Sequence, residues 1–326
     1  RVEPRFKRFN AHWGAKAYEF LETIEPKALP PELVYPFGGG DLMMALATFP
    51  NAEVVTTLSL ELAGDPRRLA GLDAGRLEKS LDAIAEAAAS TLSSNDSKSV
   101  NLSKIQQGEL PGQLSMQLMG LWLNGRVPVS ARYFRVEPDG SLHYYTKAEV
   151  DAVEGKTAQQ LKSSWRPPDF SPAFANVEVV FVMAKDPGAP PRTWRHIAVN
   201  LSNAGLEAAP GVLKHLESKG RVAAMTKAAS YLLWREEFSV IRSYLVGHAR
   251  FMISDSTGVP PRFWPKGCTA KTYGAFDQTF LRTWEPLQEE LAREFQRQPY
   301  RALPMRFGYP DGSPEKKSHL FTVECP

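Results

Sequence analysis

The chain has 326 residues, of which 43% are hydrophobic and 23% are charged, so it can bury a large core and is not disordered. Lysine and arginine number 39 against 36 aspartates and glutamates, and this even balance disfavours a surface for nucleic acid. No apolar run reaches the ~18 residues that a membrane-spanning helix needs, so we predict no transmembrane segment.

The first predicted elements form a strand, helix, strand unit. A helix over residues 10–24 precedes it, followed by the proline-rich breaker "EPKALPPE". Residues 34–37 then have the composition of a strand, residues 41–49 have the length of a short helix, and residues 54–60 are rich in β-branched side chains. We therefore predict that the two strands are parallel neighbours in one mixed sheet.

The middle of the chain mixes helices with β-rich pairs. Helical spacing of apolar residues predicts helices over residues 71–92 and 111–125, the second ending at the pair Asn124-Gly125. Residues 127–146 and 177–202 each contain two β-rich runs about a turn, which predicts two β-hairpins. Between them, the proline-rich residues 163–174 are the best internal boundary by composition.

The last third predicts a short helix over residues 209–220 and a long helix over residues 227–245. Strands are expected at residues 250–255 and 318–323, with an amphipathic helix over residues 279–298 that Pro286 interrupts. The whole pattern predicts a single large α/β domain, a three-layer Rossmann-like mixed sheet with additional β-hairpins.

The two cysteines, Cys268 and Cys325, leave two interpretations open. They are either two reduced thiols in a cytoplasmic protein or one disulfide that ties down the C-terminal tail of an exported protein. Because the sequence starts at Arg1 without a methionine, we expect that a segment upstream has been removed, for example a signal peptide or lipoprotein leader.

Four segments carry a resemblance: "YPFGGGD", "TKAASYLLWREEFSVIR", "DSTGVPPRFW" and "FGYP". They resemble sequence blocks of an uncharacterised family of bacterial proteins that are usually predicted to be exported or lipid-anchored. The resemblance spans most of the chain and implies a periplasmic or lipid-anchored location in the bacterial envelope. It implies no reaction, and a cytoplasmic location is the alternative if the missing start reflects truncation alone.

A glycine-rich turn is the main candidate site. Gly38, Gly39 and Gly40 stand between the first strand and a helix that starts near Asp41, and Glu61 follows the second strand. This order is typical of nucleotide or S-adenosylmethionine sites, where the glycines admit the ligand and a later acid binds ribose hydroxyls. The motif is "GGGD", however, and Asp41 would repel a phosphate. A purely structural alternative is a tight turn with Asp41 as the helix N-cap.

The other patterns are weaker. "DSTG" at residues 255–258 resembles an aspartic protease motif with one residue inserted, and turn chemistry explains it better. Neither a His-Glu-x-x-His nor a Cys-x-x-Cys motif occurs, so we predict no metal site, and no G-x-S-x-G elbow occurs. Further polar groups expected around the glycine turn are Arg235, which shares a helix face with Arg242, and Asp255.

Two functions remain. The first is an exported envelope protein of unknown activity that binds a small molecule in a cleft at the glycine turn. The alternative is an S-adenosylmethionine-dependent methyltransferase-like enzyme on a Rossmann-like fold. The sequence does not determine whether the protein is an enzyme, whether it takes a cofactor, or its oligomeric state.

Overall fold

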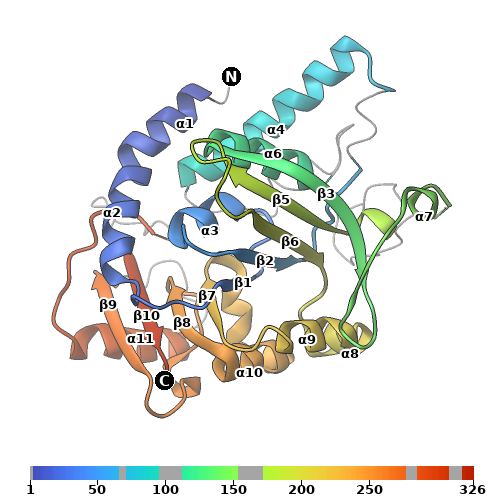
Figure 1. Ribbon diagram of the computed structural model, residues 1–326. Helices are drawn as coiled ribbons and strands as arrows, with labels where there is room; N and C mark the ends of the chain where they lie inside the picture. Colours follow the sequence, from blue (N-terminus) through green and yellow to red (C-terminus); the bar gives the residue numbers. More distant parts are fainter. Residues whose placement is uncertain (1–2, 66–70, 95–111, 153–171, 277–284, 308–317) are drawn as a thin grey trace.

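The computed structural model describes residues 3–65, 71–94, 112–152, 172–276, 285–307 and 318–326. Its centre is a ten-stranded mixed sheet with the order β4-β3-β5-β6-β2-β1-β7-β8-β10-β9, which confirms the predicted α/β class (Figure 1). The strands are β1 (Glu32–Pro36), β2 (Val54–Ser59), β3 (Arg126–Val136), β4 (Leu142–Tyr144), β5 (Asn176–Met183), β6 (Arg192–Ala198), β7 (Val222–Thr226), β8 (Ala249–Ser254), β9 (Thr269–Gly274) and β10 (His319–Glu324).

Five strands at the centre, β6, β2, β1, β7 and β8, run parallel to one another. The predicted pairing of the first two strands is confirmed, since Val34 of β1 lies opposite Thr56 of β2. From β1 the chain moves to β2 on one side, whereas β7 pairs with the opposite edge of β1. The connections therefore diverge between β1 and β7, which makes this the topological switch point of the sheet.

Antiparallel strands extend the sheet on both sides. β3, β5 and β6 pair antiparallel in turn, and among the described residues the short β4 pairs only with residues 134–136 of β3. On the other side, β10 lies antiparallel between β8 and β9. The sequence did not predict β9, because "TAKTYG" lacks a clear alternation of apolar and polar residues.

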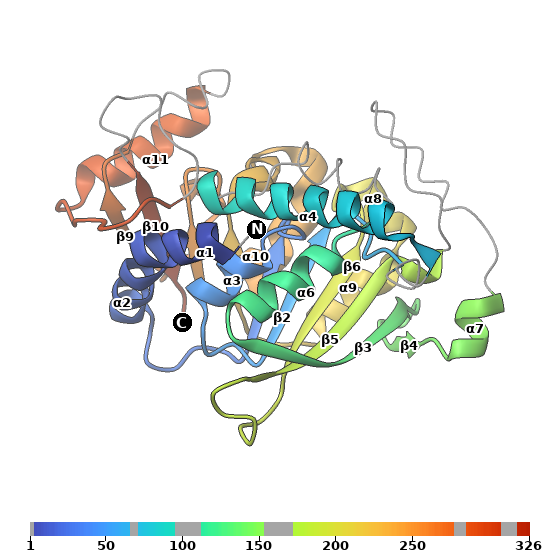
Figure 2. The ribbon, with the colours of Figure 1, turned by 90° about the horizontal axis from the view of Figure 1, so that it is seen from above.

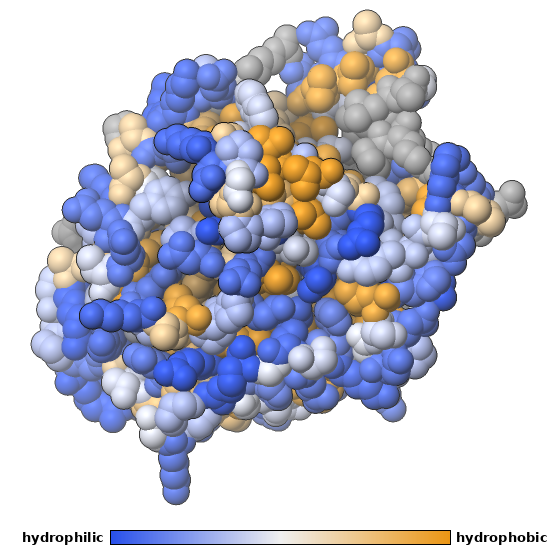
Figure 3. Space-filling view, in the orientation of Figure 1, coloured by the Kyte–Doolittle hydropathy of each residue, from blue (hydrophilic) through white to orange (hydrophobic). Residues whose placement is uncertain are grey.

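The outer part of β3 carries exposed apolar side chains. Val127 and Val129 are 42% and 56% exposed, and hydrophobic colouring gathers in Figure 3 over the region of β3 and β5. Pro128 lacks a backbone N–H, and the register shifts between Pro128 and Ser130. Proline and a bulge are common means of preventing further strand pairing at a sheet edge.

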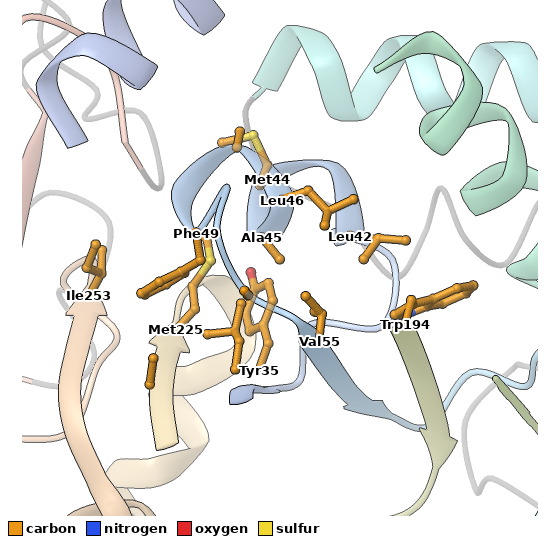
Figure 4. Close-up of a cluster of buried hydrophobic side chains, with 14 of the residues drawn as sticks. Tyr35, Leu42, Met44, Ala45, Leu46, Phe49, Val55, Trp194, Met225 and Ile253 are labelled. Carbon is orange, nitrogen blue, oxygen red and sulfur yellow. The ribbon is translucent and has the colours of Figure 1, made fainter. Parts of the chain in front are cut away.

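Helices cover both faces of the sheet (Figure 2). On one face, all seven residues of α3 (Leu42–Thr48) are buried, and Leu42, Ala45 and Leu46 belong to the core cluster that contains Tyr35, Val55 and Trp194 of three neighbouring strands (Figure 4). The helices on this side are α1 (Glu3–Phe9), a π-helical turn (Asn10–Gly14), α2 (Ala15–Ile24), α3 (Leu42–Thr48) and α6 (Leu114–Leu123), with α4 (Ala74–Ser94) packed on α1 and α6.

The opposite face is covered by a second set of helices. Val34, Leu58 and Ala224 point to this side and pack in a cluster with Leu216 and Ile241 of the covering helices. These helices are α8 (Asn203–Ala208), α9 (Pro210–Glu217), α10 (Ser239–His248) and α11 (Glu285–Arg297). Among the described residues, no helix combines the length and apolarity needed to cross a membrane.

The single helix predicted over residues 227–245 is wrong. Two 3-10 helices, Ala228–Trp234 and Glu236–Phe238, precede α10, and Arg235 between them is extended, with φ −90° and ψ 148°. The guanidinium of Arg242 stabilises this break, because it donates to the carbonyls of Leu233 (2.9 Å) and Arg235 (3.0 Å). A tertiary hydrogen bond thus overrides the helical spacing of the apolar residues.

Two proline-based predictions have different outcomes. The boundary at residues 163–174 lies mostly outside the described residues, which include only the 3-10 turn Pro172–Phe174. Pro286 does not interrupt α11, which begins at Glu285. In the first turn of a helix the missing N–H of proline removes no hydrogen bond, so Pro286 suits the start of this helix. The earlier part of that prediction, residues 279–284, is not described.

Candidate functional site

The turn after β1 has an unusual backbone. Phe37 has a φ of 62°, and among the described residues it alone combines a positive φ with a side chain other than glycine. This conformation is costly for a bulky residue and persists only where the surroundings hold it. The Phe37 ring packs edge-to-face on Phe238, with ring centroids 5.8 Å apart. Strain at the carboxyl end of a central strand is a feature that functional sites share.

The glycines that follow are needed because protein side chains approach them closely. A Cβ at Gly38 would lie 2.3 Å from the Tyr35 ring. A Cβ at Gly39 would lie 2.0 Å from Ser59 Oγ and 2.9 Å from Gln113 Nε2. The space beside Gly39 is therefore filled by the protein itself, which supports the structural interpretation of these glycines. Residues 38–40, including Gly40, are all buried.

Asp41 occupies the N-cap position of α3, but its side chain makes no capping hydrogen bond. The carboxylate instead accepts a hydrogen bond from Tyr35 Oη (2.8 Å) and lies 3.5 Å from the ammonium of Lys227. Asp41 therefore stands at the predicted N-cap position, but its side chain does not make the capping hydrogen bond expected there. The carboxylate turns toward the switch point, where β1 and β7 end.

Lys227 directly follows β7 and its side chain is 0% exposed. Its ammonium lies 3.5 Å from the Asp41 carboxylate and 5.5 Å from the centroid of the Phe307 ring. Neither β7 nor a site role for Lys227 was predicted from the sequence, which placed Lys227 at the start of a helix. The available signal was a lysine directly after the apolar run "VAAMT", which has the composition of a buried parallel strand.

A cluster of hydrogen-bonded side chains, centred on Gln113, lies on the other side of the glycine turn, near the ends of β2 and β6. Gln113 Nε2 donates to Ser59 Oγ (3.3 Å) and to the backbone carbonyl of Glu61 (3.3 Å). Gln117, one helical turn later, donates to the carbonyl of Gly39 (3.1 Å). Gln113 Oε1 is buried and has no hydrogen-bond partner among the described residues. Burial raises the pKa of the Glu61 carboxyl, against a smaller lowering by its hydrogen bond with Ser59.

His196 is locked in one neutral tautomer beneath this group. Trp194 Nε1 donates to Thr57 Oγ1 (2.9 Å), and Thr57 Oγ1 lies 3.2 Å from His196 Nδ1. His196 Nε2 lies 2.6 Å from the Glu61 carbonyl, which can only accept, so the proton is on Nε2. Burial lowers the pKa of His196 to about 4, which favours the neutral imidazole.

Asp255 lies at the end of β8, beside the end of β7. Its Oδ1 accepts hydrogen bonds from the backbone N–H (2.8 Å) and the hydroxyl (2.5 Å) of Thr257. Its own N–H donates to the Thr226 carbonyl (3.3 Å). This geometry agrees with the interpretation of "DSTG" as a turn.

The two predicted arginines do not share a helix face. Arg235 is exposed and pairs with Glu237 (3.2 Å), whereas Arg242 is buried, bonded to the helix break and stacked on Phe263 at 3.9 Å. The structure therefore brings Asp41 and Lys227 together on one side of the glycine turn. On the other side, Gln113 contacts Ser59 and the backbone carbonyl of Glu61, and both Ser59 and Gln113 lie close to Gly39.

Within the described part of the chain, no three His, Cys, Asp or Glu side chains are grouped so that they could hold a metal ion. Comparisons of the chain with protein-family models, with curated proteins and with solved structures gave no match. A functional interpretation therefore rests on the geometry at the carboxyl ends of the parallel strands, around the glycine turn.

Proposed function

We propose that the protein binds a small polar molecule at the carboxyl ends of its parallel strands, at the switch point between β1 and β7. The observation that carries the proposal is the buried pair of Lys227 and Asp41, 0% and 1% exposed, at this point of the sheet. Taking two charges out of water costs several kcal/mol, and well-packed apolar residues would fold at least as well. A costly pair at the place where α/β sheets bind ligands supports a role in binding.

The two sides of the turn define the chemistry of the ligand. On the side of β7, the ammonium and carboxylate provide fixed charges. On the side of β2, Gln113 Oε1 is a buried acceptor with no partner in the described part of the chain, and burial favours the neutral acid form of Glu61. The ligand that suits both sides has one charged group and, some atoms away, neutral hydrogen-bonding groups.

A thermal-shift screen tests this proposal. The panel contains S-adenosylmethionine, adenine nucleotides, amino acids and sugar phosphates. A compound present at about 100 times its Kd should stabilise the fold by about 2.7 kcal/mol. The same compound should give no shift with the double variant Lys227→Met/Asp41→Asn, which removes both charges together. An equal shift in the double variant would refute the site.

The proposed location is the bacterial envelope, either periplasmic or lipid-anchored. The support is the disulfide between Cys268 and Cys325, which joins the start of β9 to the end of β10 with a Cα–Cα distance of 4.2 Å. Disulfides of this kind persist in oxidising compartments and are rare in the cytosol. Alkylation without reductant, followed by mass spectrometry, should leave both cysteines unmodified in protein taken from its native cells. Two alkylated thiols would contradict an envelope location.

Methyl transfer from S-adenosylmethionine is the second candidate, and the strand order favours it. Numbered along the chain without the β3-β4-β5 insertion, the strands lie in the order 3-2-1-4-5-7-6, and the last strand is antiparallel to its neighbours. Methyltransferases with a Rossmann-like sheet have this order, which is an analogy of fold and not of site. Against it, Ser59 and Gln113 fill the space beside Gly39 where a cofactor would lie.

Isothermal titration with S-adenosylhomocysteine separates the two candidates. The methyltransferase alternative predicts saturable binding that Glu61→Gln weakens, because the amide alters the group expected at the ribose hydroxyls. Binding of another panel compound, with no heat from S-adenosylhomocysteine, would reject methyl transfer and keep the first proposal.

A further inference from the structure

A cavity of about 320 Å³ lies far along the sheet from the glycine turn, between the edge strand β9 and helix α11. Figure 1 shows these two elements side by side at the C-terminal end of the fold. The volume is within the range of small-molecule sites, about 300 to 1,000 Å³. The proposed function does not use this cavity.

The lining of the cavity is aromatic and neutral. Phe276, Phe295 and Tyr300 contribute rings, and Thr272, Gln296 and Gln298 contribute hydrogen-bonding groups. None of the described residues that line the cavity is charged. A charged ligand would lose water there without gaining a counter-charge, so the cavity suits a neutral one. A purely apolar ligand would leave the carboxamides without partners.

Gln298 holds its amide in a fixed orientation. Its Oε1 accepts from the backbone N–H of Thr272 (3.2 Å) and from Arg301 Nη1 (3.1 Å), and both partners can only donate. The oxygen is therefore assigned by the network, and the NH₂ group lies on the other branch of the amide. This leaves two oriented donors on a residue that lines the cavity.

The aromatic rings can stack on one side of a ligand but cannot enclose a flat ligand between them. Phe276 and Phe295 have centroids 5.3 Å apart at an angle of 31°, so they contact each other and leave no space for a flat base between them. Tyr300 is 76% exposed beside the cavity. An aromatic ring and carboxamide donors lining one cavity match a sugar ring, which has an apolar C–H face and a rim of hydroxyl groups.

We infer that the cavity between β9 and α11 binds a neutral sugar ring, with Tyr300 as the stacking platform and Gln298 as the hydroxyl-binding donor. The sugar's hydroxyl oxygens accept from the Gln298 amide, while its C–H face covers the aromatic rings. The cavity is thus a second binding site, separate from the switch point.

Saturation-transfer NMR with the intact protein tests this inference, using maltotriose, triacetylchitotriose and adenosine as probes. At least one saccharide should receive saturation, with its ring C–H protons receiving most. Transfer to adenosine alone, or to no probe, would overturn the inference.

Two variants locate the binding. Tyr300→Ala removes an exposed ring and should weaken the saccharide about tenfold. Gln298→Glu keeps an acceptor for Thr272 and Arg301 but loses the amide donors, so it should weaken binding about tenfold while the melting temperature is maintained. Trp122→Ala removes another exposed aromatic, 64% exposed on α6, and should leave binding unchanged. Unchanged binding in both Tyr300→Ala and Gln298→Glu would overturn the assignment.

Discussion

Both sides of the glycine turn bury polar groups, but the groups differ in charge. On the β7 side, the chain buries charges, with Lys227 beside Asp41 at 3.5 Å. On the β2 side, burial shifts two groups toward their neutral forms, since it raises the pKa of Glu61 and lowers that of His196 to about 4. The neutral side can be stable without a ligand, because hydrogen bonds satisfy most of its groups. The charged side carries a folding cost, which is why we assign it the binding role.

The largest expected effect tests the charged side. Lys227→Met leaves the buried carboxylate of Asp41 without this ammonium and should lower the free energy of unfolding by about 4 kcal/mol, measured by urea denaturation. The matched control is Lys147→Met, which breaks the exposed pair with Asp151 and should leave stability unchanged. Similar small effects in both variants would remove the distinction between the two sides.

The next largest effect is a loss of stability in acid that arises from His196, on the β2 side of the turn. Because the folded protein lowers the pKa of His196 to about 4, the unfolded chain binds a proton there first as the pH falls below 6.5. The stability from His196 is therefore present above pH 6.5 and is lost toward pH 4, a loss of about 3 kcal/mol. His196→Gln should remove that part of the acid sensitivity in urea melts at both pH values. His215, whose pKa burial also lowers to about 4, contributes equally in both proteins.

A smaller effect tests the turn between the two sides. In Gly39→Ala, the new Cβ would lie 2.0 Å from Ser59 Oγ, so Ser59 and Gln113 must move. We expect a loss of about 2 kcal/mol. Gly247→Ala in α10 is the control, because nothing lies within 4 Å of its Cβ and alanine favours a helix. If Gly39→Ala is as stable as the control, the close packing of the turn is wrong.

The smallest effect contrasts two acid-to-amide changes. Glu61→Gln resembles the neutral acid that burial favours and should cost less than about 1 kcal/mol. Because burial raises the pKa of Glu61 in the folded protein, the wild type loses stability as the pH rises through that pKa. The free energy of unfolding of Glu61→Gln should therefore increase relative to the wild type at higher pH. Asp41→Asn should cost more, because it leaves the Lys227 ammonium without this carboxylate. Equal costs in urea melts at pH 5 and pH 8 would contradict the contrast.

Sequence patterns predicted the parts of the fold that local chemistry determines. The parallel pairing of β1 and β2 and the position of α6 followed from apolar spacing and turn residues. β9 and the helix break at Arg235 did not, because a neighbouring strand and the Arg242 guanidinium determine them. For the site, the glycines and Asp41 were visible as a motif. Lys227 was not, since its role depends on β7 lying beside β1, a pairing of residues far apart in sequence.

Hydrogen–deuterium exchange, with and without the panel compound that raises the melting temperature most, tests the binding site most directly. If the ligand binds at the switch point, exchange should slow at the amides of residues 38–41 and 227–230, which flank the Lys227–Asp41 pair. The amides of β9 and α11 should be unaffected by that compound. Protection that leaves out both flanking segments, or a panel in which no compound protects them, would contradict a ligand site at this edge of the sheet.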